Sequence, residues 1–571
     1  MFKPQLINSL KNYSGKTFVS DLIAGIIVGI VALPLAIAFA IASGVNPAAG
    51  LFTAIIAGFC ISAFGGSTVQ IGGPTGAFAV IVYAVVAQHG LSGLAVATIM
   101  AGILLILLGV FKMGGLVKFI PYTIVTGFTA GIAVTIAAGQ IGDFFGLTPD
   151  FSVPVTILGE TYSKMPGDFL PKIIMYAKSF GTINMYSTVM AAVCLAFIFI
   201  WARFSKKIPG SFVVLILATV ASILLDKFFG LKTDTIGFFA DGREHFVIPS
   251  TLPLPQFPEI SISAIRNLFP TAVSIAVLAA VESLLSAVVA DGMTGAKHDS
   301  NTELIAQGIA NIASPLFGGI PATGAIARTA TNIKNGGQTP VAGIIHAITL
   351  LLILLFFGKY AAYIPMAALA AVLINVAWNM AGIKAIKSLV KGQKSDTAVF
   401  ATTFLITVFV DLTVAIEVGL GLAAFFFIKK MIELSEVQSA RETQIGGIIA
   451  NNDTDEKALE VPENVMVYEI DGPLFFGTVR KFEVAVEQAG LKYKVLILRM
   501  RHTLYLDAGG IRALEQAKAV CDRLKVTIVI SGIHTQPYML LEKTGMADVI
   551  GRENIFDHID QALERARELT K

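Results

Sequence analysis

The sequence predicts a polytopic α-helical membrane protein that ends in a small α/β domain. Of its 571 residues, 55% are hydrophobic and 14% are charged, and the mean hydropathy is +0.75. Ordinary soluble domains carry roughly 25% charged residues. The charges are unevenly distributed, because residues 21–140 carry very few of them whereas residues 432–571 resemble a soluble sequence. These observations indicate a multi-span bundle followed by one soluble domain.

Fourteen apolar segments are candidate spans, several of them shorter than the roughly 20 residues that a helix needs to cross a bilayer. An even number of spans returns the chain to the side of the membrane on which it began. The segments lie near residues 21–41, 48–64, 75–89, 92–111, 117–140, 187–204, 211–229, 271–291, 303–316, 323–335, 339–357, 365–380, 396–411 and 413–431.

Basic residues predict the orientation of the spans, because cytoplasmic loops are enriched in Lys and Arg. With the N-terminus inside, the short cytoplasmic loops carry Lys112, Arg203, Lys297 and Lys384, among others. The predicted location is the inner (cytoplasmic) membrane, with both ends of the chain in the cytoplasm. The expected domains are a cytoplasmic N-terminal segment (1–20), a transmembrane domain (21–431), a linker (432–460) and the C-terminal domain (461–571).

The C-terminal domain alternates short apolar runs with helical patterns, which is typical of a small α/β domain. The predicted strands are Val465–Ile470, Val495–Met500 and Val526–Ile530. The predicted helices are Leu506–Arg523, Gln536–Thr544 and Ile555–Leu569.

Two Gly- and Pro-rich runs, Gly72–Phe78 and Gly318–Ala325, open the third and tenth candidate spans. Each stands third in its half of seven spans, and an odd number of spans inverts one half relative to the other. Matching interrupted spans of this kind are typical of inverted-repeat secondary transporters. A helix that begins inside the membrane leaves its first N–H groups unpaired, and its dipole favours an anion there.

We therefore predict an anion site between the two helix N-termini. Thr75, Thr323 and the backbone amides of the runs, around Gly324, would be the donors. The alternative is that the glycines only allow helices to pack closely.

Two charged residues lie within apolar segments, where charge is costly and usually functional. Glu282 stands in the middle of the eighth span, and Ser286 one turn later shares its face. We expect Glu282 and Ser286 to bind the coupling ion, and Arg328 to supply a positive charge beside the anion. The alternatives are a structural hydrogen bond or ion pair for Glu282 and snorkelling of Arg328.

Other features exclude several function classes. Cys60, Cys194 and Cys521 form no disulfide or metal pattern, and the histidines lack metal-ligand spacing. A net charge of +3 is too small to indicate nucleic-acid binding. The sequence carries no P-loop, serine elbow or dinucleotide fingerprint in a suitable context, so an enzyme or an ATP-driven pump is not expected. Pro34 predicts a kink in the first span, after which Phe39 could line the cavity.

In combination and order, these motifs resemble the SulP anion transporter family, whose members end in a STAS domain. The resemblance covers nearly the whole chain. Its markers are Leu33–Ala40, Pro47–Phe52, Gly73–Thr75, Glu282–Gly295 and Thr323–Thr329. It implies fourteen spans in two inverted seven-span repeats, divided into core and gate domains, and frequent homodimers. It also implies a pocket formed by Phe39, Thr75, Ala77, Phe78, Glu282, Ala325 and Arg328.

The resemblance also bears on substrate, coupling and regulation. Leu35 stands where some animal members have a pocket glutamine. Glu282 stands where sodium-coupled bicarbonate carriers have Asp, and it looks more like the proton-coupled bacterial branch, some members of which carry C4-dicarboxylates. Ala508 and Gly509 stand where the anti-sigma antagonists have a phosphorylatable serine, and Asp507 is expected to cap the helix that follows.

The sequence thus predicts secondary active transport of a small anion, namely sulfate, a C4-dicarboxylate or bicarbonate, by symport with H⁺ or Na⁺. It predicts no other cofactor. The expected partners are the anion, the bilayer, a second copy of the chain and a cytoplasmic regulator at the STAS domain. The alternatives are an uncoupled anion channel or exchanger and, more remotely, a nucleobase permease.

Overall fold

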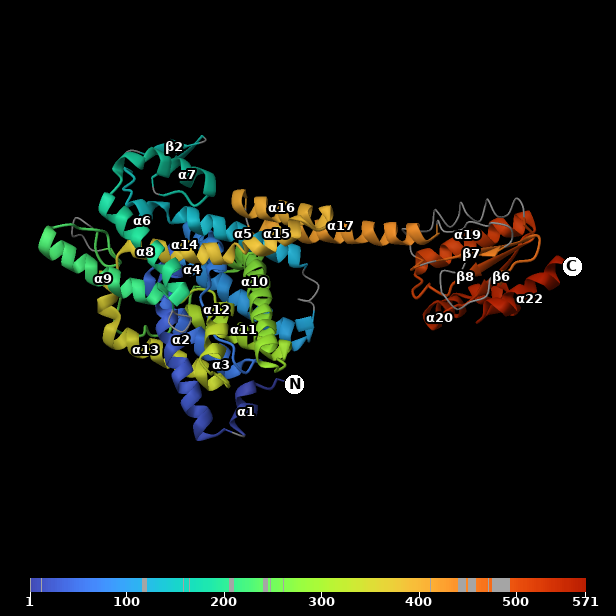
Figure 1. Cartoon of the computed structure of the whole chain (residues 1–571), viewed down its shortest axis with the longest axis horizontal. Helices are drawn as coiled ribbons and strands as arrows, with labels where there is room; N and C mark the ends of the chain where they lie inside the picture. Colours follow the sequence, from blue (N-terminus) through green and yellow to red (C-terminus); the bar gives the residue numbers. More distant parts are fainter. Residues whose placement is uncertain are drawn as a thin grey trace. The chain divides into compact units, whose positions relative to one another are not determined.

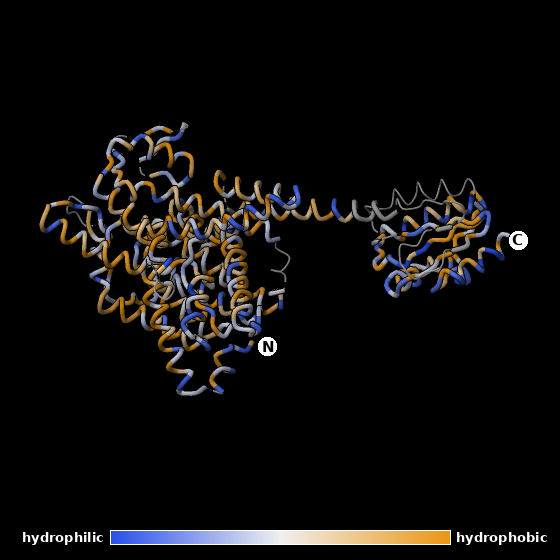
Figure 2. The backbone as a smooth tube through the Cα atoms, in the orientation of Figure 1, coloured by the Kyte–Doolittle hydropathy of each residue, from blue (hydrophilic) through white to orange (hydrophobic). Residues whose placement is uncertain are grey.

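The structure is a computed structural model of the chain, and it falls into two compact units, Met1–Ala423 and Ala424–Lys571 (Figure 1). Apolar residues run along most helices of the first unit, whereas the second mixes polar and apolar residues (Figure 2). The structure describes residues 2–11, 13–115, 121–152, 154–157, 159–163, 165–204, 210–239, 245–246, 248–259, 261–410, 412–439, 448–449, 459–470, 472–474 and 493–571.

The first unit is helical, and eight of its described helical segments are long and apolar enough to cross a membrane. The helices are α1 (Gln5–Leu10), α2 (Gly15–Ala42), α3 (Pro47–Phe64), α4 (Gly76–Val110), α5 (Tyr122–Gly139), α6 (Ile141–Phe145), α7 (Phe169–Lys178), α8 (Met185–Phe204), α9 (Gly210–Phe229), α10 (Ile262–Thr294), α11 (Ser300–Leu316), α12 (Ile326–Lys334), α13 (Pro340–Phe357), α14 (Met366–Met380), α15 (Ile383–Val390), α16 (Lys394–Phe409) and α17 (Leu412–Ser439). Short elements complete the unit: β1 (Gly72–Gly73), β2 (Val155–Ile157), β3 (Glu160–Tyr162), β4 (Thr323–Gly324), η2 (Phe180–Thr182) and η3 (Gly358–Tyr363).

A helix lies at each of the fourteen predicted segments, so the predicted arrangement of spans is confirmed. The third and fourth segments are the two parts of α4, which meet at Gly90, where φ is 67° and ψ is −173°. The tenth segment begins later than predicted, because Thr323 and Gly324 are extended and α12 starts at Ile326. The eighth begins earlier, at Ile262, because Ser261 caps the helix by accepting from the amide of Ala264.

The helices of the first unit pack into two groups. One group, the core, contains α2, α3, α4, α10, α11, α12 and α13, which are spans one to four and eight to eleven. The other, the gate, contains α5, α8, α9, α14 and α16, and α17 packs on it through Gly419, which lies against Thr403 and Ile124. Each group therefore takes corresponding spans from both halves, as an inverted repeat requires.

The second unit is built on a four-stranded parallel sheet in the order β10-β9-β8-β7. Its strands are β7 (Val465–Glu469), β8 (Val495–Arg499), β9 (Thr527–Ser531) and β10 (Ile555–Phe556). Its helices are α19 (Ala508–Leu524), α20 (Thr535–Thr544), α21 (Met546–Ile550) and α22 (Ile559–Thr570), with the 3₁₀ turn η4 (Arg552–Asn554). A separate pair, β5 (Ile448–Ile449) and β6 (Leu459–Glu460), is antiparallel.

The three predicted strands of this unit are confirmed, and one predicted helix is corrected. The pattern from Ile555 was interpreted as helical from its first residue. Ile555 and Phe556 instead pair with Ile530 and Ser531 as an edge strand, and the helix begins at Ile559. Asp507 caps α19 as expected, since its carboxylate accepts from the amide of Gly510 at 2.8 Å.

Two glycines, Gly102 of α4 and Gly308 of α11, face each other where these helices pack closely. A Cβ atom on Gly308 would lie 2.5 Å from the carbonyl oxygen of Gly102, and one on Gly102 would lie 2.7 Å from that of Gly308. The contact atoms are backbone, so a side chain at either position pushes the helices apart. Gly292 in α10 is a matched contrast, because nothing lies within 4 Å of its added Cβ.

We predict that Gly308→Ala lowers the melting temperature of the detergent-solubilised protein, because overpacking of this kind costs about 1–3 kcal/mol. Gly292→Ala should leave the melting temperature unchanged or raise it, since alanine favours a helix over glycine by roughly 1 kcal/mol. Thermal unfolding followed by intrinsic fluorescence checks both variants. Equal melting temperatures for the two would show that this helix contact is looser than described.

Candidate functional site

The site is organised by two short strands inside the core. β1 and β4 pair antiparallel, with Gly72 opposite Gly324 and Gly73 opposite Thr323. Each strand leads directly into a helix: α4 begins at Gly76 and α12 at Ile326. The antiparallel pairing therefore brings the N-termini of α4 and α12 together from opposite directions, as the two Gly/Pro runs predicted.

Side chains of α3 and α11 form hydrogen bonds with the extended backbone just before β4. Asn311 donates to the carbonyl of Ala322 at 2.8 Å and accepts from its amide at 2.9 Å. The hydroxyl of Thr53 accepts from the amide of Ile320 at 2.7 Å, and that of Ser314 donates to the carbonyl of Ile320 at 2.7 Å. Backbone that is not helical is tolerated at membrane depth only where such partners exist.

The segment that leads into β1 is held in the same way from α12. Thr329 accepts from the amide of Ile71 at 3.1 Å, and Asn332 donates to the carbonyl of Val69 at 2.9 Å. The amide of Ala325 donates to the carbonyl of Ile71 at 2.8 Å. These supporting residues were missed by the sequence analysis, although polar residues inside apolar segments were a signal that could have found them.

Neither helix N-terminus is capped by a side chain. Thr75 and Ala325 occupy the cap positions of α4 and α12, and neither makes a side-chain capping hydrogen bond. The first amides of a helix lack intrahelical partners and carry the positive end of its dipole. Both termini can therefore donate to an anion placed between them.

Arg328 places a positive charge beside this pair of strands. Its side chain is only 2% exposed, and neither Nη1 nor Nη2 has a hydrogen-bond partner among the described residues. Its Nη1 would lie 2.2 Å from a Cβ on Gly73, so only glycine leaves room for the guanidinium at that point of β1. A buried guanidinium without partners is costly, and an anion would supply them.

The neighbours of Arg328 do not supply a counter-charge. Within the described part of the chain no ion pair joins it to Glu282. His346 of α13 is fully buried close to β1, because a Cβ on Gly58 would lie 3.5 Å from His346 Cε1 and 3.2 Å from the carbonyl oxygen of Gly72. Neither ring nitrogen of His346 has a hydrogen-bond partner among the described residues. His346 was predicted only to lack metal-ligand spacing and was not expected near the site.

Glu282 lies across from the N-terminus of α4. The hydroxyl of Thr75 donates to Glu282 Oε2 at 2.8 Å. Both side chains are partly exposed, whereas Ser283 and Ser286 on the same helix are fully buried. The predicted ion-coupling residue thus touches one of the predicted anion donors.

Two residues predicted for the site have hydroxyl groups that already bond to neighbouring elements in the conformation described. The hydroxyl of Thr323 donates to the carbonyl of Ala279 at 2.9 Å. The hydroxyl of Ser286 pairs with that of Thr329 at 3.3 Å. Both hydroxyls link α10 to β4 or α12, because a buried hydroxyl needs a partner and the nearest ones lie on the neighbouring element.

The remaining predicted pocket residues surround the start of α4. A Cβ on Gly76 would lie 3.1 Å from the ring of Phe39, and Ala77 and Phe78 are fully buried. Two gate residues lie equally near: the added Cβ of Gly76 would be 3.1 Å from Met380 Sδ and 3.2 Å from Ile136 Cδ1. The sequence analysis missed these two, because an apolar residue in an apolar span gives no local signal.

The other predicted residue of β4, Gly324, has no room for a side chain. An added Cβ would lie 1.6 Å from Gln70 Nε2. Gln70 donates to the hydroxyl of Ser283 at 3.0 Å, and Ser283 donates to Glu303 Oε1 at 3.1 Å. Glu303, fully buried, also accepts from Gln307 at 2.8 Å. The carboxyl group of Glu303 therefore belongs to the hydrogen-bond chain that holds Gln70 against Gly324. It was not among the predicted site residues.

Known proteins resemble the chain over nearly its whole length. Residues 18–403 match the sulfate permease family, and residues 456–562 match the STAS domain. The putative sulfate transporter YvdB of Bacillus subtilis is 42% identical over 552 residues, which is 96% of this chain and 98% of that protein. The bicarbonate transporter BicA of Picosynechococcus is 31% identical over 472 residues, covering 81% of this chain and 79% of BicA. Both relatives are named as transporters.

Solved structures agree in fold. The murine anion transporter Slc26a9 in its inward-facing state has a TM-score of 0.83 at 21% identity, and the match covers 99% of this chain and 94% of that one. The transmembrane domain of a cyanobacterial BicA has a TM-score of 0.61 at 30% identity, over 71% of this chain and 98% of that one. With the family matched over residues 18–403 and the relatives aligned almost end to end, the chain belongs to the sulfate permease (SulP) family of anion transporters and carries a C-terminal STAS domain.

Proposed function

We propose that this anion transporter binds a small oxyanion between the N-termini of α4 and α12 and carries it in symport with a proton. The observation that carries the proposal is Arg328, whose buried Nη groups lack partners among the described residues beside two uncapped helix N-termini. Such a concentration of donors and positive charge favours an anion over a neutral substrate such as a nucleobase.

The contact between Thr75 and Glu282 suggests how the proton and the anion are coupled. An ionised carboxylate only accepts hydrogen bonds, so it holds the Thr75 hydroxyl hydrogen and repels an anion nearby. A protonated carboxyl becomes a donor, which allows the Thr75 hydrogen to turn to the anion. Protonation of Glu282 would thus remove a like charge and release a donor in one step, so proton and anion would bind together.

The proposed substrates are sulfate, bicarbonate and C4-dicarboxylates. Two of the relatives described above are named for sulfate and bicarbonate. Phe39, Ala77, Phe78, Gly324 and Ala325 would shape the pocket around Thr75 and Arg328. Movement of the core against Met380 and Ile136 of the gate would open the pocket to one side and then the other.

We also propose that the chain forms a homodimer in the inner membrane, with the N-terminus and the STAS domain in the cytoplasm. The orientation rests on the Lys and Arg residues of the short loops. The STAS domain would bind a regulatory partner rather than act on the substrate.

We predict that an imposed inward proton gradient stimulates uptake of labelled anion into proteoliposomes, and that Glu282→Gln abolishes the stimulation. Labelled succinate, sulfate and bicarbonate are compared, each with and without sodium. Glutamine fills the same volume and is permanently neutral, so it isolates the proton. Stimulation by sodium instead of protons would reassign the coupling ion, and gradient-independent conductance that survives in Glu282→Gln would identify a channel.

We further predict that Thr75→Val raises the KM for the anion roughly 10- to 100-fold, because a hydrogen bond to a charged group contributes about 1.5–3 kcal/mol. Thr323→Val is the matched control. Its lost hydroxyl bonds to the Ala279 carbonyl, so it should lower the melting temperature while the KM changes little. Uptake kinetics across anion concentrations measure both. Equal KM changes in the two variants would contradict the assignment of Thr75 as the anion donor.

A further inference from the structure

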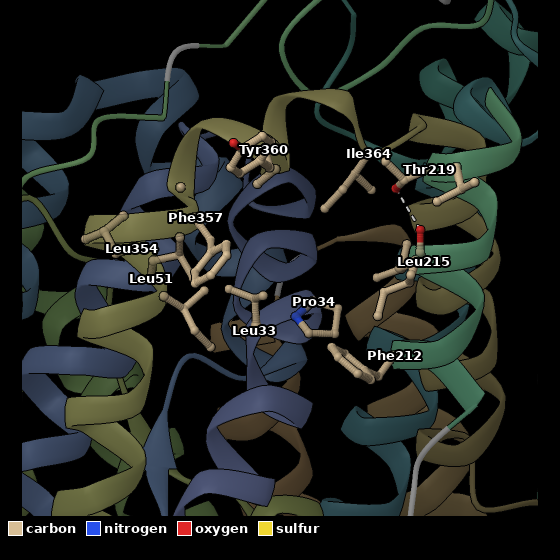
Figure 3. Close-up of a pocket in the computed structure, with 15 residues that line it drawn as sticks. Leu33, Pro34, Leu51, Phe212, Leu215, Thr219, Leu354, Phe357, Tyr360 and Ile364 are labelled. Carbon is tan, nitrogen blue, oxygen red and sulfur yellow. Dashed lines mark hydrogen bonds between the residues drawn. The ribbon is translucent and has the colours of Figure 1, made fainter. Parts of the chain in front are cut away.

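An apolar cavity of about 240 Å³ lies between core and gate helices, outside the anion site (Figure 3). Its core wall comes from α2, α3 and α13, and its gate wall from α9. Residues that define it include Leu33, Pro34, Leu51, Phe212, Leu215 and Phe357.

The lining of the cavity has almost no polar groups that could form hydrogen bonds with water. Thr219 on its α9 wall uses its hydroxyl internally, by donating to the Leu215 carbonyl at 2.7 Å (Figure 3). An ordered water needs two to four polar partners, and cavities lined by apolar groups stay dry. The occupant that suits this lining is therefore itself apolar.

The cavity is also open to the lipid-facing surface of the helices. Four of its lining residues remain about half exposed: Ile216 (49%), Val220 (51%), Phe357 (61%) and Tyr360 (56%). These side chains lie on or next to membrane-spanning helices, where the surrounding solvent is hydrocarbon. Lipid chains thus have direct access to the cavity.

Tyr360 of the cavity lining and its chain neighbour Lys359 are of two residue types that commonly lie at the membrane–water boundary. Tyr360 lines the cavity, and the Nζ of Lys359 lies 5.2 Å from the centre of its ring. Both belong to η3, which follows α13. The end of η3 joins backbone outside the spans, since the amide of Gly237 donates to the carbonyl of Ala362 at 2.8 Å. Tyrosine and lysine at such positions hold an apolar body in the bilayer and a polar tip at the headgroups.

We propose that this cavity binds one acyl chain of a membrane phospholipid, whose phosphate lies beside Lys359 and Tyr360. Because one wall belongs to the core and the other to the gate, the space between them changes when the two groups move. A chain that fits this conformation better than another stabilises it, and the lipid then regulates transport through its preference for one state.

The test uses full-length wild-type protein in vesicles that contain a phosphatidylglycerol with a photoreactive diazirine on its acyl chain. After illumination, mass spectrometry locates the attached lipid. Attachment to the peptides of Ile353–Ile364 and Phe212–Val220 should exceed attachment to lipid-facing residues elsewhere at least fivefold. Attachment spread evenly over the exposed helix surfaces would overturn the proposal.

Two pairs of variants sharpen the result. Leu215→Trp fills the cavity and should lower attachment at Ile353–Ile364 at least threefold, whereas Leu217→Trp, at a 52% exposed position of the same helix, should not. Lys359→Gln should lower attachment severalfold. Lys227→Gln should not, although Lys227 also stands over an aromatic ring, that of Phe228. Equal attachment in both members of each pair would contradict the site. Lipid attachment is measured without any transported anion, so this result is independent of the proposed substrate and coupling.

Discussion

The core of this transporter depends on the backbone pairing between β1 and β4. Two extended strands inside a membrane present amides and carbonyls that lipid cannot satisfy, and each unsatisfied group would cost several kcal/mol. The strands pair with each other, and polar side chains of α3, α11 and α12 bond to the extended backbone that leads into them. This requirement explains why Thr53, Asn311 and Asn332 are fully buried in segments that are otherwise apolar.

The pairing of β1 with β4 also determines where the guanidinium of Arg328 can lie. Gly73 faces Thr323, and its missing side chain is the space that the Arg328 guanidinium occupies. The arginine is therefore held beside the helix N-termini by packing, without a carboxylate partner among the described residues. The polar chain from Gln70 through Ser283 to Glu303 fixes the helix that carries Glu282. Helix α10 therefore carries both a supporting residue and a site residue: Ser283 bonds to Gln70 and Glu303, and Glu282 bonds to Thr75.

Much of this arrangement was predictable from the sequence, and the failures have a common cause. Hydropathy and the two Gly/Pro runs predicted the spans, the inversion and the meeting of the half-helices, because these follow from local composition and order. The direction of a hydroxyl hydrogen was not predictable. Thr323 was expected to donate to the anion, and it donates to Ala279, because its nearest acceptor lies on α10. Met380 and Ile136 were missed for a similar reason, since only the packing of gate on core distinguishes them from other apolar residues.

The two halves of the site are equivalent in backbone but not in charge. Phe78 and Arg328 are both the third residue of their half-helices, counted from Gly76 and Ile326. A site with arginine at both positions would bind an anion tightly and release it slowly. In the proposed mechanism, a single arginine beside a single titratable glutamate would leave a net charge that one proton changes. Inverted symmetry provides the two matching helix N-termini, and under the proposed symport the sequence difference between the halves would make the affinity for the anion depend on one proton.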